Sequence, residues 1–271
     1  MLQLIADKTQ NLKEFTDNHY AQGSFYFDTL LKKKDIKVNG QRIGKNIMLQ
    51  AGDTVAYYTS PKQEERAAFY IVYEDENVLV IDKESGVNSE AVFAALSRAG
   101  EYYFIHRLDR NTKGLMVFAR TAKAETELLS AFKEKTIEKY YHALCFGAPK
   151  KNADVLTAYL KKDEKASRVH IFDTPQKGTE TIVTEYRVLA SNDEVSTLEV
   201  CLHTGKTHQI RAHLAHIGCP IVGDMKYGNE VKNKERKMAR QCLIAKKLRI
   251  DCAGTLAYLN EKTFISQFDV T

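Results

Sequence analysis

From about residue 69 onward, short apolar runs alternate with polar turns, and this pattern constrains the fold more than any other feature of the sequence. The stretch FYIVYEDENVLVIDK predicts two strands around a polar turn, and further strands are predicted for GLMVFAR, EKYYHALCFG, TIVTEYRVLA and VSTLEVCLHTG. SEAVFAALSRAG and TAKAETELLSAFKEK, the latter with Thr121 as its N-cap, have helical spacing instead. Strands outnumber helices and hairpin-like links dominate. The sequence therefore predicts an α+β fold with a mixed, largely antiparallel sheet.

The first 60 residues predict a small separate unit. LKEFTDNHY and SFYFDTLLKKK have helical spacing, and Asn39-Gly40 within DIKVNGQRI predicts a hairpin. The segment TSPKQEER then predicts a linker. We therefore expect two domains, residues 1–60 and residues 61–271. All motifs that could carry chemistry lie in the second domain, so removal of residues 1–60 is expected to leave the active-site geometry intact.

The formal net charge is +5, but the cations are concentrated in two segments. Residues 32–45 hold six basic residues and one acid, and residues 229–249 hold eight basic residues and two acids. Such patches on a near-balanced protein indicate either a polyanionic partner or a solvated lysine-rich surface. The cations of the first segment that we expect to contact an RNA backbone are Lys32, Lys33, Lys34, Lys37 and Arg42.

Composition argues against several classes of protein. Hydrophobic residues make up 44% and charged residues 28%, as in ordinary globular proteins. No window approaches the roughly 18 apolar residues of a membrane span, and the first residues lack the pattern of a signal peptide. The five cysteines include no Cys-x-x-Cys, so reduced thiols are expected rather than disulfides or a zinc cluster. We expect a cytoplasmic, monomeric protein that has no membrane contact.

The stretch IHRLDRNTKGLMVFAR places charges where packing alone would not require them. Asp109 lies between Arg107 and Arg110, directly after His106, in a polar turn that precedes a buried apolar run. Packing a strand requires no such charges, so this turn is a candidate for chemistry, with Asp109 as its acidic group.

A second stretch, HTGKTHQIRAHLAHIGCP, predicts a helix with Thr207 as N-cap that ends at Gly218. On the helical wheel Arg211 lies about 60° from Leu214, which belongs to the apolar stripe. An arginine at the border of the buried face usually meets a carboxylate or a phosphate. Arg211 is therefore a candidate partner for an acidic group.

The histidines of this stretch do not form the pattern of a metal site. On a helix, His208 and His213 point roughly 140° apart, and no acidic residue lies among them. We expect no metal. In EKYYHALCFG, neighbouring side chains of a strand face opposite sides, so only one of Tyr140 and Tyr141 is expected to face any pocket.

Several motifs together resemble one known family, the ribosomal large-subunit type of pseudouridine synthases. HRLDRNTKG is similar to its His-Arg-Leu-Asp motif, and HTGKTHQIRAHLAHIGCPIVGDMKYG is similar to its Thr-Gly-Arg-x-His-Gln-Ile-Arg and Gly-Asp-x-x-Tyr-Gly block. EDENVLVIDKESG and EKYYHALCFG match further strand motifs, and residues 1–60 resemble a small αL RNA-binding domain. The resemblance implies an RNA pseudouridine synthase with a mixed sheet and no cofactor.

By this resemblance Asp109 is the catalytic carboxylate, which either attacks C1′ of the ribose or removes a proton from C2′. Arg211 is its bidentate partner, and Tyr141 either stacks on the uracil or acts on the ring proton. The target uridine must be flipped out of folded RNA, and Arg107 together with His106 supports that state.

Lys206 and His208 are further residues that the resemblance places at the RNA. The expected substrate is ribosomal RNA, 23S in particular, with transfer RNA as the second choice.

Three positions depart from the family pattern. Glu84 stands where the family has proline, Lys113 replaces a serine, and Lys206 replaces an arginine. These departures leave the choice of substrate open. Two other functions also stay open: a non-catalytic RNA-binding assembly factor, and an Asp-dependent glycosidase, for which no second carboxylate stands out.

Overall fold

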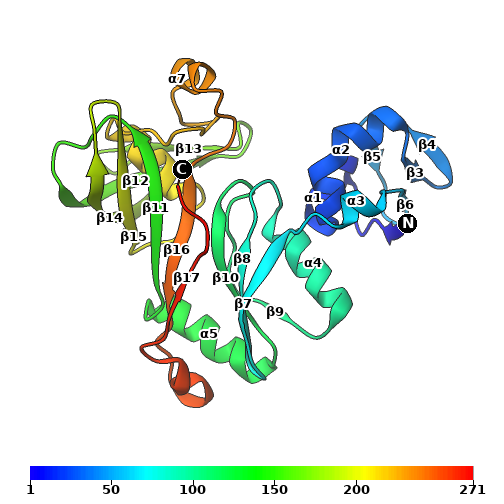
Figure 1. Ribbon diagram of the computed structural model, residues 1–271, viewed down its shortest axis with the longest axis horizontal. Helices are drawn as coiled ribbons and strands as arrows, with labels where there is room; N and C mark the ends of the chain where they lie inside the picture. The colour runs from blue at the N-terminus through cyan, green and yellow to red at the C-terminus, as the bar shows by residue number, and fades with distance from the viewer. Residues whose placement is uncertain (271) are drawn as a thin grey trace.

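The computed structural model describes residues 1–270 and shows two parts side by side (Figure 1). We refer to residues 1–60 as the N-terminal unit and to residues 61–270 as the sheet domain. The N-terminal unit lies next to helix α4 (Ser89–Ala99) of the sheet domain, with its helix α1 (Leu12–His19) against α4.

The N-terminal unit has a sheet and a hydrophobic core of its own. Its four antiparallel strands lie in the order β1-β6-β3-β4. Asn39 and Gly40 link β3 to β4 with φ values of 49° and 82°, which confirms the predicted hairpin. Apart from α1, the elements are β1 (Leu2–Ile5), β2 (Gln10–Asn11), α2 (Ala21–Lys33), β3 (Ile36–Val38), β4 (Gln41–Ile43), β5 (Met48–Leu49) and β6 (Thr54–Tyr57).

The segment predicted as a linker contains a short helix, α3 (Pro61–Glu64). Ser60 and Gln63 form a capping box there, with proline at the first helical position, which explains why a helix begins in this polar stretch. The hydroxyl of Tyr20 contacts both Thr59 and Glu64. The connection is therefore packed on the N-terminal unit rather than extended.

The sheet domain is built on an 11-stranded sheet in the order β13-β12-β14-β15-β11-β16-β10-β8-β7, with β17 and β9 paired to β16 and β10. Within residues 1–270, the pair β10–β16 is the one parallel pair, and it joins the two halves of the sheet. The strands are β7 (Phe69–Glu74), β8 (Val78–Lys83), β9 (Tyr103–Phe104), β10 (Lys113–Ala119), β11 (Glu138–Phe146), β12 (Ala153–Asp163), β13 (Arg168–Phe172), β14 (Glu180–Ser191), β15 (Val195–Leu202), β16 (Leu243–Arg249) and β17 (Thr263–Ile265).

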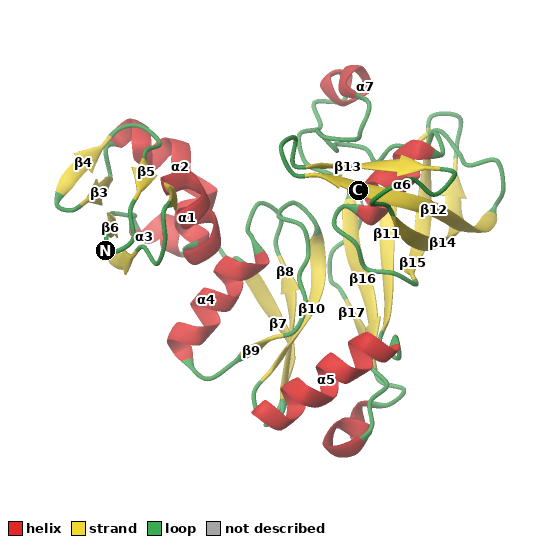
Figure 2. Cartoon of the chain, turned by 180° about the vertical axis from the view of Figure 1, so that it is seen from behind, coloured by secondary structure: helices red, strands yellow, loops and turns green. Residues whose placement is uncertain are grey.

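Helices cover both faces of the sheet around β8 and β10 (Figure 2). Along β10, Met116 and Phe118 pack on the face with α4, whereas Leu115 and Val117 pack on the face with α5. This alternation follows the two-residue period of a strand and buries both faces. The helices of the sheet domain that have not yet been placed are α5 (Ala122–Glu134), α6 (Gln209–His216), α7 (Glu230–Glu235) and the 3-10 helix η1 (Gly254–Leu259).

Gly114 permits the close approach of β10 to β16. Its φ is 113°, and a Cβ built on it would lie 2.4 Å from the backbone oxygen of Ala245. Any other residue would push the two strands apart, at the junction of the two half-sheets.

The predicted mixed, largely antiparallel sheet with helices is confirmed. The N-cap role of Thr121 is confirmed, because its side chain accepts a hydrogen bond from the backbone N–H of Ala124. The cap predicted at Thr207 is wrong, since α6 begins one residue later, after His208 in a left-handed conformation with φ of 55°. Among residues 1–270, no helix is long and apolar enough to cross a membrane.

Candidate active site

Asp109 lies in the loop 105–112 between β9 and β10, which we call the Asp109 loop. The loop is held by the sheet domain on both sides of the carboxylate. The hydroxyl of Ser89, at the start of α4, is 3.0 Å from both the backbone nitrogen and the backbone oxygen of Leu108. The N–H of Thr112 donates to the carbonyl of Asp109 at 3.0 Å, and Gln241 donates to the Thr112 hydroxyl at 2.7 Å. These bonds fix the direction in which Asp109 leaves the backbone.

Arg211 is the cation partner of Asp109. Its Nη1 donates to Oδ2 of Asp109 at 2.9 Å, which joins residues that lie 102 positions apart in the sequence. The arginine is 8% exposed, while the Asp109 side chain is 24% exposed. The carboxylate therefore reaches solvent from one side while the cation holds it from the other. The prediction that Arg211 meets an acidic group is confirmed.

The bidentate contact of Arg211 goes to a different acid, Asp224. Nε and Nη2 donate to the two oxygens of Asp224 at 2.7 and 3.0 Å, so the expected bidentate pair with Asp109 is a single hydrogen bond. Burial alone would raise the pKa of Asp224, but the hydrogen bonds and charge of Arg211 bring this pKa below its usual value. Burial likewise opposes the charge of Arg211, yet Asp224 and then Asp109 raise its pKa. Asp224 and Arg211 are therefore both charged at neutral pH.

The loop after β15 and the turn at residues 224–228 hold Arg211 and Asp224 in place. The backbone N–H groups of Lys226 and Tyr227 donate to Oδ1 of Asp224 at 2.8 and 3.1 Å. The hydroxyl of Tyr227 is 2.9 Å from Nδ1 of His208. Nε2 of His208 lies 3.9 Å from Oδ2 of Asp109. Burial lowers the pKa of His208 to about 4 although Asp109 opposes the shift, so His208 is neutral in the resting site.

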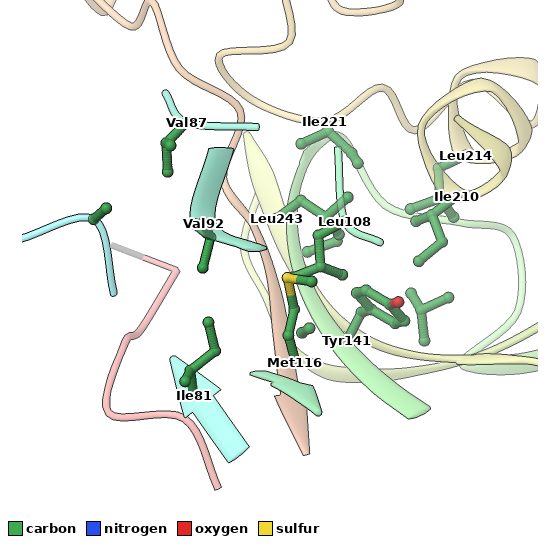
Figure 3. Packing of buried hydrophobic residues seen from close by; sticks show 14 of the residues in the cluster. Ile81, Val87, Val92, Leu108, Met116, Tyr141, Ile210, Leu214, Ile221 and Leu243 are labelled. Carbon is green, nitrogen blue, oxygen red and sulfur yellow. The ribbon is translucent and has the colours of Figure 1, made fainter. Parts of the chain in front are cut away.

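A cavity of about 920 Å³ opens over Asp109 and is lined by both Tyr140 and Tyr141. Strand alternation had predicted only one of them there. Tyr141 is 7% exposed and packs in the core cluster with Leu108 and Ile210 (Figure 3). Burial, and then the charge of Asp109, raise its pKa above the usual value. Tyr140 lies at the rim, where its ring contacts Lys247 and its hydroxyl donates to a glutamate of the same strand.

His106, Arg107 and Lys206 also line the cavity. Nε2 of His106 accepts the backbone N–H of Val117 at 3.1 Å, and burial lowers the histidine pKa to about 3. His106 is therefore neutral. The side chain of Arg107 is 66% exposed and pairs with Glu90 at 2.9 Å. The structure thus brings His106, Arg107, Lys206 and His208 around the opening that exposes Asp109.

The expected backbone-binding cations of the N-terminal unit lie outside this cavity lining. They follow the end of α2 and the β3–β4 hairpin, and all are exposed except for a half-buried Lys37, whose ammonium lies over the Tyr58 ring. Arg42 donates to the backbone oxygen of Lys34 at 2.9 Å. These cations lie at the end of α2 and on the β3–β4 hairpin: Lys32, Lys33, Lys34, Lys37 and Arg42.

The histidines near the site bind separate partners. His213 is buried beside the hydroxyl of Thr184 at 2.9 Å, and His216 lies 2.8 Å from Asp173. Within residues 1–270, one group has metal-ligand chemistry, namely Glu185 on β14, Cys201 on the neighbouring β15 and His203 directly after β15. A hydrogen bond of 2.8 Å between His203 and Glu185 accounts for that proximity.

Two of the three departures from the family pattern contact each other. Nζ of Lys113 lies 3.3 Å from Oε2 of Glu84, so the acid that replaces proline and the cation that replaces serine form an ion pair. Lys83, next to Glu84, is fully buried and donates to backbone oxygens that include that of Arg110 at 3.2 Å. Burial lowers the pKa of Lys83 to about 7, against the charge of Asp109. The departures leave the Asp109 loop connected to β8.

Asp224 and Tyr227 are site residues that sequence reasoning did not single out. Both belong to GDMKYG, which had been matched as a motif without a role for its side chains. An aspartate between a glycine and a methionine carries no periodic signal. Only its match in spacing to the Arg211 motif could have suggested the pair.

Comparison with known proteins agrees with this geometry. Residues 77–216 match the family described as RNA pseudouridylate synthase. Ribosomal large subunit pseudouridine synthase C of Rickettsia felis is 31% identical over 230 residues, which cover 74% of this chain and 75% of the relative. The protein of the same name from Vibrio parahaemolyticus is 32% identical over 225 residues, with 74% and 70% covered.

Solved structures show the same fold. Human RNA pseudouridylate synthase domain containing 1 has 27% identity and a TM-score of 0.58, covering 68% of this chain and 81% of its own. Human RNA pseudouridylate synthase domain containing 4, at 22% identity and a TM-score of 0.60, covers 73% and 88%. The chain belongs to the RNA pseudouridylate synthase family and is an RNA pseudouridine synthase, an isomerase. The resemblance to the ribosomal large-subunit type of pseudouridine synthases is thereby confirmed.

Proposed function

We propose that this enzyme converts uridines of large-subunit ribosomal RNA to pseudouridine, with Asp109 as the catalytic carboxylate. The observation that carries the assignment is the position of Asp109, whose Oδ2 is held by Arg211 at 2.9 Å beneath a cavity of about 920 Å³. The relatives that support the choice of RNA are named ribosomal large subunit pseudouridine synthases.

In this proposal the cavity receives a uridine that has been flipped out of its RNA. The reaction cleaves the bond between N1 of uracil and C1′ of the ribose, and it joins C5 of the turned uracil to C1′. Asp109 acts at the ribose, either as nucleophile at C1′ or as base at C2′. The single hydrogen bond to Arg211 orients one oxygen and leaves the other for the substrate.

Arg211 has a positioning role that depends on Asp224. Because Asp224 takes two of its donors, the guanidinium cannot rotate away from Asp109. Tyr141 supplies an apolar ring face to the uracil, and the raised pKa keeps its hydroxyl protonated. His106, Arg107, Lys206 and His208 surround the opening and support the flipped nucleotide and its phosphates.

The N-terminal unit is proposed to be an RNA-binding domain. Its exposed cations on α2 and the β3–β4 hairpin suit a phosphate backbone, which attracts charge without regard to base sequence.

The test is a pseudouridine map of total RNA from cells with and without the gene. The expected result is the loss of defined sites in large-subunit ribosomal RNA, restored by the wild-type gene but not by Asp109→Asn. Loss of sites from transfer RNA alone would show that transfer RNA is the substrate of the same reaction. Restoration by Asp109→Asn would overturn the role of Asp109.

A further inference from the structure

Arg110, the residue after Asp109, is held by the N-terminal unit. Its Nη1 lies 2.5 Å from Oδ2 of Asp17 on α1, and its Nη2 donates to the backbone oxygen of Ser24 at 3.2 Å. The Arg110 side chain is 31% exposed and that of Asp17 is 15% exposed. The contact is therefore largely shielded from water, which strengthens it relative to a surface ion pair.

Asp17 is itself held in position for this contact. Nζ of Lys13 donates to its two oxygens at 2.6 and 2.5 Å, and the Ser24 hydroxyl donates at 2.7 Å. Burial would raise the pKa of Asp17, but the hydrogen bonds from Arg110 and Lys13 bring it below the usual value. Asp17 is therefore ionised, and its hydrogen bonds from Lys13 and Ser24 orient the carboxylate for the contact with Arg110.

The same region of the N-terminal unit also contacts the turn 86–88, which is hydrogen-bonded to the Asp109 loop. Asn88, the N-cap of α4 and part of the cavity lining, donates to the side chain of Asn18 at 2.9 Å. The ring of Phe25 lies 3.6 Å from a Cβ built on Gly86, and the N–H of Gly86 donates to the carbonyl of Arg110 at 2.9 Å. The backbone of Arg110 is thus held by the sheet domain, and its side chain is held by the N-terminal unit.

We propose that Asp17 is a positioning residue for Asp109, so that the docked N-terminal unit completes the active site as well as binding RNA. This inference rests on the proposed role of Asp109. Without the Asp17 carboxylate, Arg110 becomes a cation without its partner one residue from Asp109, able to compete with Arg211 for that carboxylate. The sequence alone suggested that residues 1–60 could be removed without effect on the active site, and the contacts across the boundary predict the opposite.

The variant Asp17→Asn tests the proposal in the full chain, because it keeps the shape of the side chain and removes its charge. With saturating large-subunit ribosomal RNA transcribed in vitro, the maximal rate is expected to fall about tenfold while KM changes little, since a small displacement of a catalytic group is costly. Asp17→Glu keeps the charge and should recover part of the rate.

The matched control is Arg98→Gln. Arg98 also joins the two parts, since it donates to the carbonyl of His19 at 3.2 Å, but it lies at the far end of α4 and is exposed. This variant should keep the wild-type maximal rate. An equal loss in both variants would show that docking in general matters, rather than Asp17, and would overturn the proposal.

A double-mutant cycle shows whether Asp17 acts through Arg110. If it does, Asp17→Asn combined with Arg110→Gln should be no slower than Arg110→Gln alone. Additive losses, or a rate for Asp17→Asn within twofold of wild type, would overturn the proposal.

Amide hydrogen exchange provides a readout that needs no substrate. Asp17→Asn should speed exchange in residues 105–112, whereas Arg98→Gln should not. Unchanged exchange there would overturn the inference even if the true RNA were different. A wild-type enzyme inactive on ribosomal RNA, with faster loop exchange in Asp17→Asn, would instead count against the proposed substrate alone.

Discussion

Arg211 beside Asp109 and Lys32 at the end of α2 are both cations of one RNA-modifying enzyme, but they are placed in opposite ways. Arg211 is 8% exposed and donates to two carboxylates, whereas Lys32 is exposed to solvent. Burial fixes the geometry of Arg211 and makes each of its bonds necessary. Exposure lets a lysine follow a flexible phosphate backbone. The contrast suggests that the direction of the charge matters at the site and that the number of charges matters on the N-terminal unit.

Changing Arg211 to lysine should have the largest effect on the maximal rate. An ammonium keeps the charge but cannot donate in one plane to both Asp224 and Asp109, so Asp109 loses its orientation. We expect a rate about a hundredfold to a thousandfold lower, a loss similar to that of an oriented catalytic donor. Single-turnover kinetics measure it, and a thermal melt checks that the variant is folded. Activity within a few-fold of wild type would show that charge alone suffices and would remove the contrast with Lys32.

The two tyrosines of β11 sharpen the comparison inside the cavity. Tyr141→Phe removes a buried hydroxyl whose pKa is raised by burial and by the charge of Asp109, whereas Tyr140→Phe removes a less buried hydroxyl bonded to Glu138. The first variant should lower the maximal rate by about tenfold to a hundredfold, in the range of acid–base contributions, and the second by much less. Each variant is the control for the other in the same assay. A reversed order would place the uracil over Tyr140.

The loss of folding stability at acidic pH should depend on a buried histidine near the site rather than on the exposed cations. His213 is 2% exposed, and burial lowers its pKa to about 4 from 6.5. Between these values the unfolded chain takes up a proton that the folded chain does not. The free energy of unfolding therefore rises from pH 4 to about pH 6.5 and gains nothing more from His213 above that.

One histidine of this kind contributes a slope of about 1.4 kcal/mol per pH unit. His213→Gln should lower the slope by about that amount in urea unfolding between pH 4.5 and 6. His170→Gln, with a side chain 57% exposed on β13, is the control and should keep the wild-type slope. An unchanged slope in His213→Gln would mean that other groups cause the acid sensitivity.

How far the sequence predicted this molecule depends on the range of the contact. Strands such as β8 and β10 were predictable because their apolar residues form continuous buried runs, and the Asn39-Gly40 hairpin because its residues tolerate positive φ. Arg211 was recognised from its place on the helical wheel. These signals are local, within a few residues.

What escaped prediction depends on contacts between distant segments. The hydrogen bonds of Arg211 to Asp224, and of Arg110 to Asp17 across 93 positions, leave no trace in the hydrophobic periodicity of the sequence. The N-cap was assigned to Thr207, but His208 is the N-cap and has a left-handed conformation, which is uncommon for residues other than glycine. The hydrogen bond between His208 and Tyr227 accompanies this conformation, and it cannot be read from local propensity. Tertiary contacts decided each of these cases.

The smallest effect on the maximal rate is expected from the exposed cations of the N-terminal unit. A variant with four lysines changed to glutamine removes charge without touching Asp17 or the core of that unit: Lys32, Lys33, Lys34 and Lys37. Each phosphate contact contributes roughly 0.7 to 0.9 to the salt slope, so the plot of log affinity against log salt should flatten by about 3 if all four bind RNA.

The matched control removes four exposed lysines from the β12–β14 side of the sheet domain: Lys161, Lys162, Lys165 and Lys177. Because the change in net charge is the same, a general loss of attraction for RNA would appear in both variants, and only contact at the N-terminal unit would separate them. At saturating RNA the maximal rate of the first variant should equal that of wild type, since none of its lysines holds Asp109 or Arg110. Equal salt slopes in the two variants would show that this surface serves something other than the substrate. A fall in the maximal rate of the first variant alone would mean that RNA bound to the N-terminal unit also acts on the Asp109 loop. The distinction between Arg211, where the direction of the charge matters, and the exposed lysines, where only their number matters, would then be wrong.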